Sequence, residues 1–232
     1  MQKKWVWYVI ASTLGFYTHA YFIFVPIAQA LHWFLGKTHQ RRDPFVKSIL
    51  VFGLLIAPWL WKIVLESSRL KESWYYPVNL NLVKSVLGNM FLGYEGTPWY
   101  LWQYTAYLSF LLVFLFALAL RNKTTRYRNL FFALLVTVPL TIVIGISFFK
   151  PLFVNRYLLP VTIAEVFLVA LAIESIKHPL LQRLLAITSI GFCLFFNVWY
   201  PKEHPKLNIR STVTEVNTLR DADDVIFADS PL

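Results

Sequence analysis

Long apolar runs separated by short polar segments dominate this chain. A helix needs roughly 20 apolar residues to cross ~30 Å of hydrocarbon, and several of the runs approach that length while others are short. The runs lie at about residues 5–15, 21–35, 48–61, 101–120, 130–149, 157–173 and 181–199. This pattern predicts an all-α protein, a polytopic transmembrane helical bundle with about seven membrane helices.

The first two runs are together too long for one comfortable span and short for two. Polar, interface-seeking side chains interrupt them at Tyr17, Thr18 and His19. We therefore predict a helical hairpin that turns at residues 17–19. A cleaved signal peptide is the alternative, because Lys3-Lys4 precedes the apolar stretch and Ala28-Gln29-Ala30 resembles a cleavage site. The stretch nevertheless runs well past a normal signal-peptide core.

Composition supports the membrane class. Hydrophobic residues make up 57% of the chain, aromatic residues 18%, and the mean hydropathy is +0.54, values that exclude an ordinary soluble domain. The formal charge of +10 does not indicate nucleic-acid binding, because Lys and Arg lie mainly between the apolar runs, where they orient helices. The single cysteine, Cys193, lies inside an apolar run and excludes an intramolecular disulfide.

Basic residues are distributed unevenly between the predicted loops. Loops 37–47, 121–128 and 177–183 are rich in Lys and Arg, and they alternate with loops 62–99 and 150–156 and with the C-terminal tail. Because cytoplasmic loops carry the excess of Lys and Arg, the basic set is expected inside. We therefore expect an integral protein of the inner or plasma membrane, with a cytoplasmic N-terminus and an extracytoplasmic C-terminal tail.

The loop after residue 61 contains a further helical pattern at residues 77–92. Its apolar positions are Leu80, Val83, Val86, Leu87, Met90 and Phe91, with polar residues between them. This period predicts an interfacial helix lying along the membrane surface. Nearby carboxylates and aromatic rings could stack on and hydrogen-bond a sugar, but residue by residue they are better explained as an interfacial aromatic belt. They are Glu66, Glu72, Trp74, Tyr75, Tyr76, Tyr94 and Glu95.

The long apolar runs end before residue 200, and the sequence that follows is more polar. We expect a transmembrane helical domain at 1–200 and the start of an extracytoplasmic soluble segment at 201–232. Residues 211–219 resemble a capped helix and residues 224–229 a buried strand, so the prediction is a short extracytoplasmic α/β tail. One helix and one strand cannot bury a core alone. The tail therefore either packs on the membrane domain or belongs to a larger soluble module.

Arg156 is the strongest candidate for chemistry. It opens an apolar run in the sequence Asn155-Arg156-Tyr157-Leu158-Leu159-Pro160. Because hydrocarbon flanks this segment, the guanidinium must find water, a carboxylate or an anionic headgroup. Its rigid fork of donors suits a lipid-linked phosphate. The alternative is a snorkelling cation that only anchors its helix.

Glu165 is the one carboxylate clearly within a predicted span. An acid at that depth costs about 3 kcal/mol or more, so it is expected to face other helices or a wet cavity. It would be the coupling or pairing group of a lipid or amphiphile transporter or flippase. Repeated halves and broken helices, which are typical of transporters, are not visible in the sequence.

Several other chemistries lack their motifs. The sequence has no glycine-rich phosphate loop, no Gly-x-Ser-x-Gly elbow and no paired His/Cys spacing for zinc, and no metal site or other cofactor is identifiable. Among the histidines, only His19 is expected near Arg156. An interface histidine without function is the alternative there.

Two motif-like stretches resemble a known family. The Tyr17-Thr18-His19 turn of a hairpin, and Asn155-Arg156-Tyr157-Leu158-Leu159-Pro160 opening a later span, resemble the later membrane portion of bacterial GT-C glycosyltransferases of the dolichyl-phosphate-mannose mannosyltransferase or aminoarabinose transferase type. The resemblance covers most of residues 3–200. It implies transfer of a sugar from a polyprenyl-phosphate donor to a lipid, glycan or protein acceptor at the outer membrane face.

The resemblance also implies residue roles. Arg156 corresponds to a donor-phosphate contact, and Tyr17, His19, Tyr157 and Glu165 are cavity-lining candidates. The acidic catalytic loop that the family carries after its first transmembrane helix is missing ahead of Tyr17. We therefore expect a fragment without the catalytic N-terminal half, and the catalytic residues remain unassigned. The resemblance leaves room for a divalent metal ion in the complete enzyme. Apart from the transporter, the remaining alternative is a membrane fragment with no activity of its own.

Overall fold

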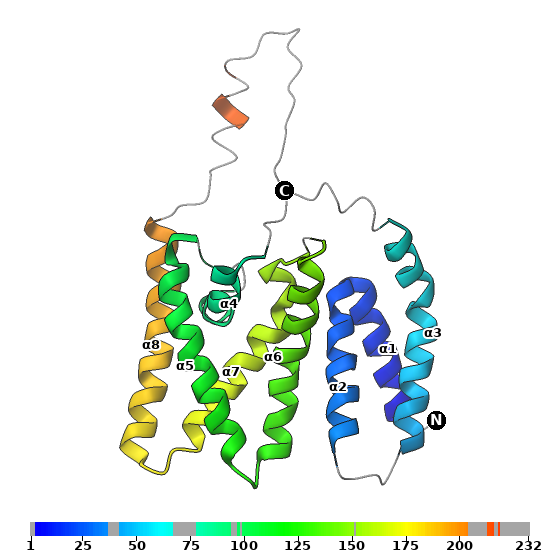
Figure 1. The fold of residues 1–232 in the computed structure, drawn as a ribbon, viewed down its shortest axis with the longest axis horizontal. Coiled ribbons are helices and arrows are strands. Elements are labelled where there is room, and N and C mark those ends of the chain that lie inside the picture. The colour runs from blue at the N-terminus through cyan, green and yellow to red at the C-terminus, as the bar shows by residue number, and fades with distance from the viewer. Residues whose placement is uncertain are drawn as a thin grey trace. The chain divides into compact units, whose positions relative to one another are not determined.

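The structure is a computed structural model that describes residues 3–36, 42–66, 78–93, 97, 99–150, 152–203, 213–215 and 218. Helices account for all regular structure in these residues (Figure 1). The helices are α1 (Lys3–Thr18), η1 (Ala20–Ile23), α2 (Phe24–Leu35), α3 (Arg42–Glu66), α4 (Leu80–Leu92), η3 (Trp99–Leu101), α5 (Trp102–Arg121), α6 (Arg126–Ser147), η4 (Asn155–Leu158), α7 (Leu159–Glu174) and α8 (Pro179–Glu203).

Five helical segments are long and apolar enough to cross a membrane. They are Pro44–Glu66, Trp102–Arg121, Arg126–Ser147, Asn155–Glu174 and Pro179–Trp199. The predicted hairpin is confirmed, because α1 ends at Thr18 and η1 begins at Ala20. The first arm of the hairpin, α1, has 16 residues. The second arm, formed by η1 and α2, spans Ala20–Leu35. Both arms are shorter than the roughly 20 residues that a full crossing requires. The described residues are therefore all-helical as predicted, with five candidate membrane spans rather than about seven.

The chain separates into two compact units, Met1–Thr188 and Ser189–Leu232. The division lies within α8, whereas the sequence suggested a boundary near residue 200. Of the predicted tail helix, Val213–Glu215 and Thr218 are described and helical. The predicted strand at 224–229 lies outside the described residues, as do Glu72, Trp74, Tyr75, Tyr76, Tyr94 and Glu95.

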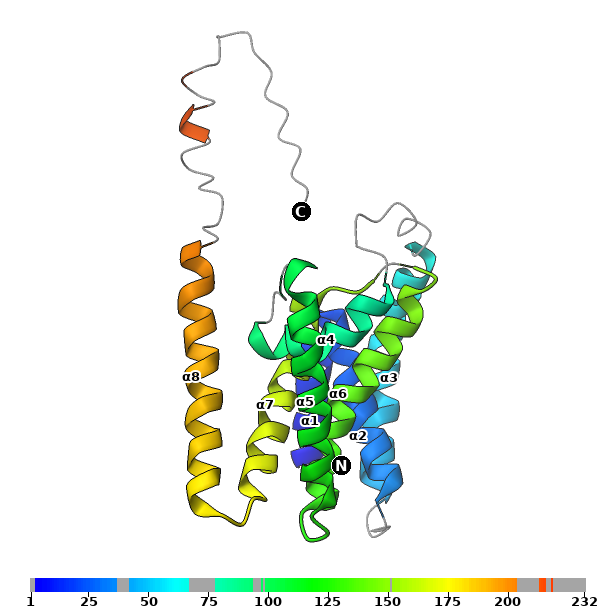
Figure 2. The same cartoon turned by 60° about the vertical axis from the view of Figure 1, so that its left-hand side comes forward.

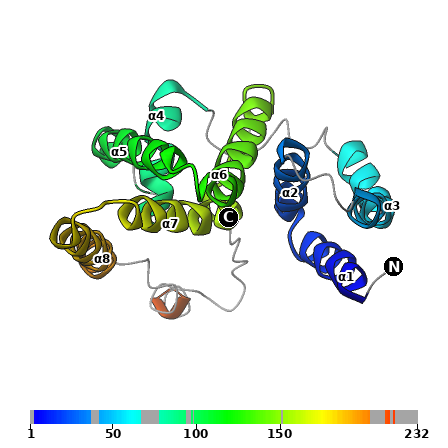
Figure 3. The same cartoon turned by 90° about the horizontal axis from the view of Figure 1, so that it is seen from below.

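Two groups of helices make up the first unit. Helices α1 and α3 pack together around Phe16, Phe52 and Ile56, and the larger core joins α4, α5, α6 and α7. Figure 3 looks along the helices and shows α2 beside α6, where the two groups meet. The two groups of helices contact each other closely in the last turn of α2, where the centroids of the His32 and Tyr127 rings lie 4.1 Å apart.

Helix α4 exists as predicted, and it buries part of the predicted apolar face, at Val86 and Met90. Asn79 caps it by accepting a 2.8 Å hydrogen bond from the Leu82 amide. The predicted apolar positions Leu80 and Val83 are 73% and 36% exposed. Two polar side chains, Ser85 and Asn89, are also buried. Figures 1 and 2 show α4 lying across the direction of its neighbours, against α5.

Hydrogen bonds pair the polar groups that are buried where α4 meets α5. The Gly88 amide donates to the Ser109 hydroxyl at 2.8 Å, and the Ser109 hydroxyl donates to the Thr105 carbonyl at 2.9 Å. The Asn89 side-chain amide donates to the Ser85 hydroxyl at 3.0 Å, and its carbonyl accepts from the Thr97 hydroxyl. Because buried polar groups are stable only when paired, this network allows Ser85 and Asn89 to lie in the buried face of α4.

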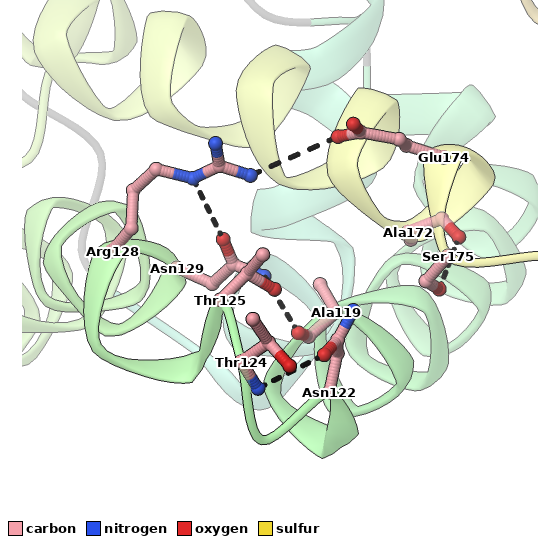
Figure 4. Close-up of polar contacts among 9 residues, drawn as sticks. All are labelled: Ala119, Asn122, Thr124, Thr125, Arg128, Asn129, Ala172, Glu174 and Ser175. Carbon is pink, nitrogen blue, oxygen red and sulfur yellow. Dashed lines mark hydrogen bonds and ion pairs between the residues drawn. The ribbon is translucent and has the colours of Figure 1, made fainter.

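Two of the basic turns lie at the same end of the first unit. The turns between α5 and α6 and between α7 and α8 lie together at the end where α2 also ends (Figure 1). Figure 4 shows the contacts there: Arg128 forms a 3.8 Å ion pair with Glu174, and buried Asn129 donates a 2.7 Å hydrogen bond to the Ala119 carbonyl. Among the described residues, the basic turns at 121–128 and 177–183 therefore lie at one end of the unit, and the segment at 150–156 lies toward the other.

Candidate functional site

The candidate site lies where the hairpin turn meets the segment that precedes α7. The His19 ring lies 4.6 Å from the Tyr157 ring and 5.5 Å from the Tyr21 ring, centroid to centroid. The Tyr21 hydroxyl donates a hydrogen bond to the Leu152 carbonyl, which joins segments 131 residues apart. These contacts bring two of the predicted residues, His19 and Tyr157, into one cluster.

Arg156 belongs to this cluster and is exposed. Its guanidinium carbon lies 5.4 Å from the centre of the Tyr157 ring, a cation–π contact. Among the described residues Arg156 has no carboxylate partner, since the ion pair found there joins Arg128 and Glu174. Its charge is thus available to an anionic ligand.

The local sequence places Arg156 at the beginning of a helix. Asn155–Leu158 forms the short helix η4, and Pro160 lies in the first turn of α7, where its missing amide proton and fixed φ are tolerated. The first amides of a helix have no partner within the helix and carry a partial positive charge. Guanidinium and helix terminus together make this region electropositive.

Tyr17 and Glu165 do not join the cluster in the described contacts. The Tyr17 hydroxyl donates a 3.0 Å hydrogen bond to the Leu55 carbonyl of α3, and its ring lies 6.3 Å from that of Trp59. Glu165 is completely buried in α7. It faces protein rather than lipid, as expected from the cost of placing an acid in hydrocarbon. Within the described part of the chain, neither carboxylate oxygen of Glu165 has a hydrogen-bond partner.

Tyr21 is the residue of this cluster that the sequence does not single out. It begins an apolar run, so its ring counts toward burial in any hydropathy argument. The sequence feature that could have identified Tyr21 is its hydroxyl group, because a tyrosine at a membrane interface usually directs that group to a polar partner. Within the described residues, no group of three or more His, Cys, Asp or Glu side chains lies close enough together to hold a metal ion.

His19 also holds the turn together. Its Nδ1 accepts a 3.3 Å hydrogen bond from the Tyr21 amide, which caps η1, and burial lowers the pKa of the imidazole. In the range just below an unfolded-state pKa of about 6.5, the unfolded chain therefore binds more protons than the folded one. The stability contributed by neutral His19 is complete above about pH 6.5 and is lost as the pH falls through the lower folded-state pKa.

We therefore expect the folded state to lose stability as the pH falls below about 6.5, in part through His19. His19→Asn keeps a capping acceptor that does not titrate, so it should reduce this pH dependence while stability at neutral pH changes little. Thermal unfolding of both proteins in detergent, measured across this range, gives the comparison. An identical pH dependence in the two proteins would contradict the assignment to His19.

Comparison of the chain with protein-family models, with curated proteins and with solved structures finds no match.

Proposed function

We propose that this chain is part of a membrane glycosyltransferase that uses a polyprenyl-phosphate-linked sugar, with Arg156 as the contact to the donor phosphate. The observation that supports this proposal most is the exposed guanidinium of Arg156, which lies over Tyr157 at the beginning of α7. Guanidinium groups bind phosphate through two parallel hydrogen bonds, and a helix N-terminus adds favourable electrostatics. Tyr157, His19 and Tyr21 fix the surroundings of this cation.

The reaction would be a displacement at the anomeric carbon of the donor. The bond from that carbon to the phosphate oxygen breaks, the acceptor hydroxyl oxygen forms the new bond, and polyprenyl phosphate leaves with the electron pair. Positive charge beside the leaving phosphate stabilises the negative charge that develops on it, and this is the role that we propose for Arg156. The acceptor proton passes to a base that we do not assign to any residue of this chain.

The proposal places the Arg156 cluster at the outer membrane face. The helix ends rich in Lys and Arg lie at the opposite end of the first unit (Figure 1), and such ends favour the cytoplasm. Reporter fusions at Thr125 and His178 should therefore give a cytoplasmic signal, and a fusion at Glu72 should give an external one. An external signal at Thr125 would reverse the orientation and remove Arg156 from the outer face.

Substitution of Arg156 by lysine tests the donor contact. Lysine keeps the charge and the long stem of an anchor but loses the bidentate geometry. A charge-assisted hydrogen bond contributes about 1.5–3 kcal/mol, so Arg156→Lys should weaken binding of a polyprenyl-phosphate hexose by roughly tenfold or more. Binding is measured with purified protein in lipid nanodiscs. Arg121→Lys, at the far end of α5, is the matched control and should bind like the unmodified protein.

Unchanged binding in Arg156→Lys would show that Arg156 only anchors its helix. Weakened binding in both variants would indicate a general effect of arginine loss on the membrane domain. Only a selective loss in Arg156→Lys supports the donor contact.

Transport of a lipid or amphiphile is the second candidate function, and the buried carboxyl of Glu165 favours it. An acid inside a bundle without a hydrogen-bonded partner is typical of a site that couples or pairs with a translocated group. Reconstituted liposomes containing a fluorescent polyprenyl-phosphate lipid test this candidate. Lipid exchange between leaflets that Glu165→Gln abolishes would support transport, and exchange equal to that of protein-free liposomes would exclude it.

A further inference from the structure

A pocket between α4 and α5 is separate from the residues discussed so far. It has a volume of about 620 Å³ and is lined by Asn79, Asn81, Lys84, Tyr100, Trp102, Gln103, Ala106, Tyr107 and Phe110. This volume lies within the range of roughly 300–1,000 Å³ that is usual for small-molecule sites. None of these residues belongs to the Arg156 cluster or to the motif-like stretches of the sequence.

The lining residues come from one face of each helix. Gln103, Ala106, Tyr107 and Phe110 follow the i, i+3, i+4, i+7 spacing that places side chains along one side of a helix. Asn81 and Lys84 are three residues apart on α4, next to the capping residue Asn79. The hollow therefore arises from how α4 crosses α5, and the close contact at Gly88 fixes that crossing.

Two of the lining groups are held in place before any ligand binds. The Trp102 indole N–H donates a 2.9 Å hydrogen bond to the Thr97 carbonyl, and the ring packs partly into the main core. The Asn79 side-chain carbonyl is engaged by the Leu82 amide at 2.8 Å, which fixes the direction of its NH₂ group. Rigid groups lose less conformational entropy on binding than mobile ones.

The chemistry of the lining selects the class of ligand. It combines aromatic rings, three side-chain amides and one cation, and the described lining contains no carboxylate. Aromatic faces cover the apolar side of a flat ligand while amides exchange hydrogen bonds with its hydroxyl groups. A single lysine is too little to attract an anionic lipid surface strongly, because each cation near such a surface contributes only about 1 kcal/mol.

We propose that the pocket between α4 and α5 binds a saccharide, with sugar rings against Tyr107 and Trp102 and hydroxyl groups at Gln103, Asn79 and Asn81. The proposal concerns binding and does not depend on glycosyl transfer. It gives the crossing of α4 over α5 a function beyond packing.

Tyr107 and Tyr104 provide a matched pair of test positions. They are 66% and 69% exposed on the same helix, and only Tyr107 lines the pocket. Both rings are largely outside the core, so both tyrosine-to-alanine variants should fold. Saturation-transfer difference NMR with purified protein and free disaccharides of glucose, mannose and N-acetylglucosamine reports binding without any polyprenyl donor.

At least one disaccharide should bind saturably at concentrations up to about 10 mM, tenfold above a Kd of ~1 mM. Tyr107→Ala and Gln103→Ala should each weaken that binding about fivefold or more, as expected for loss of an aromatic or hydrogen-bonding contact. Tyr104→Ala and Arg156→Lys should leave it unchanged. Retention in Arg156→Lys separates this proposal from the donor site.

Three results would overturn the proposal. These are the absence of saturable binding to every disaccharide, binding that Tyr107→Ala and Gln103→Ala leave intact, and binding to phosphatidylglycerol vesicles alone that Lys84→Ala removes. The last result would make the pocket an anionic headgroup site.

Discussion

Gly88→Ala is expected to lower the free energy of unfolding by more than the ~1–3 kcal/mol that forcing extra volume into a packed site usually costs. A Cβ atom at residue 88 would lie 2.1 Å from the Thr105 carbonyl oxygen and 2.9 Å from the carbonyl carbon. These are backbone atoms, so no side-chain rotation can relieve the overlap. The two helices would have to move apart.

Separation of α4 from α5 would also break hydrogen bonds. The Gly88 amide donates to the Ser109 hydroxyl at 2.8 Å, and both residues are buried. The Ser109 hydroxyl would lose this donor in a place that water cannot reach, and leaving a buried polar group unpaired costs about 1–3 kcal/mol. The effect of one methyl group therefore exceeds the loss expected from steric overlap alone.

Other helical glycines provide controls for Gly88→Ala. At Gly53 in α3 and Gly145 in α6, no atom lies within 4 Å of the position that an added Cβ atom would occupy. Alanine at either position should therefore be neutral or should stabilise the helix by up to about 1 kcal/mol. Unfolding in detergent by heat or by increasing SDS compares the three variants. Stability of Gly88→Ala equal to that of Gly53→Ala would contradict the close contact between α4 and α5.

The helices themselves were largely predictable from hydropathy. A membrane span must satisfy its own backbone hydrogen bonds, so a long apolar run has little choice but to be helical. The turn at Tyr17–His19 was also predictable, because His19 is polar and its ring nitrogen can cap the next helix. The limits of the spans were less accurate: α3 continues to Glu66, beyond the last apolar residue of the predicted run.

The buried face of α4 was predictable from apolar spacing only in part, since Val86 and Met90 are buried as expected and other positions are not. Leu80 and Val83 lie on the face that hydropathy selects, and they are exposed. Ser85 and Asn89 are buried as well: the Asn89 amide donates to the Ser85 hydroxyl one turn earlier, and the Asn89 carbonyl accepts from Thr97 outside the helix. Gly88 was the residue in the sequence that could have indicated the face in contact with α5, since a small residue permits two helices to approach closely.

The candidate site was predictable in part. Arg156 and Tyr157 are adjacent in the sequence, but the contact between Tyr157 and His19 depends on how α1 and α7 are placed. Tyr17 shares the hairpin turn with His19 and still faces α3, because successive residues at a helix end point in different directions. Sequence neighbours in a turn therefore need not share a site.

Glu165→Met is expected to raise the free energy of unfolding by about 1–3 kcal/mol, the penalty of a buried polar group without a partner. Glu165 is completely buried, and neither carboxylate oxygen is hydrogen-bonded to the described residues. Methionine has a similar length, no polar atoms that require a partner, and enough flexibility to fill the space. Removal of the desolvation penalty of the carboxyl group should stabilise the fold by more than any imperfect packing of the methionine destabilises it.

Two variants show whether the gain comes from removing a buried polar group. Glu165→Gln keeps polar atoms in the same place and should gain little. Glu174→Met removes the exposed carboxylate that pairs with Arg128 at 3.8 Å, and it should change stability by less than about 1 kcal/mol. Unfolding curves in one detergent give all three values.

A clear loss of stability in Glu165→Met would mean that the carboxyl has a structural partner, and it would remove the argument for transport. A gain would identify Glu165 as a residue that costs the fold stability, which is typical of a group required for function, and the lipid-exchange assay with Glu165→Gln would then show whether that function is transport.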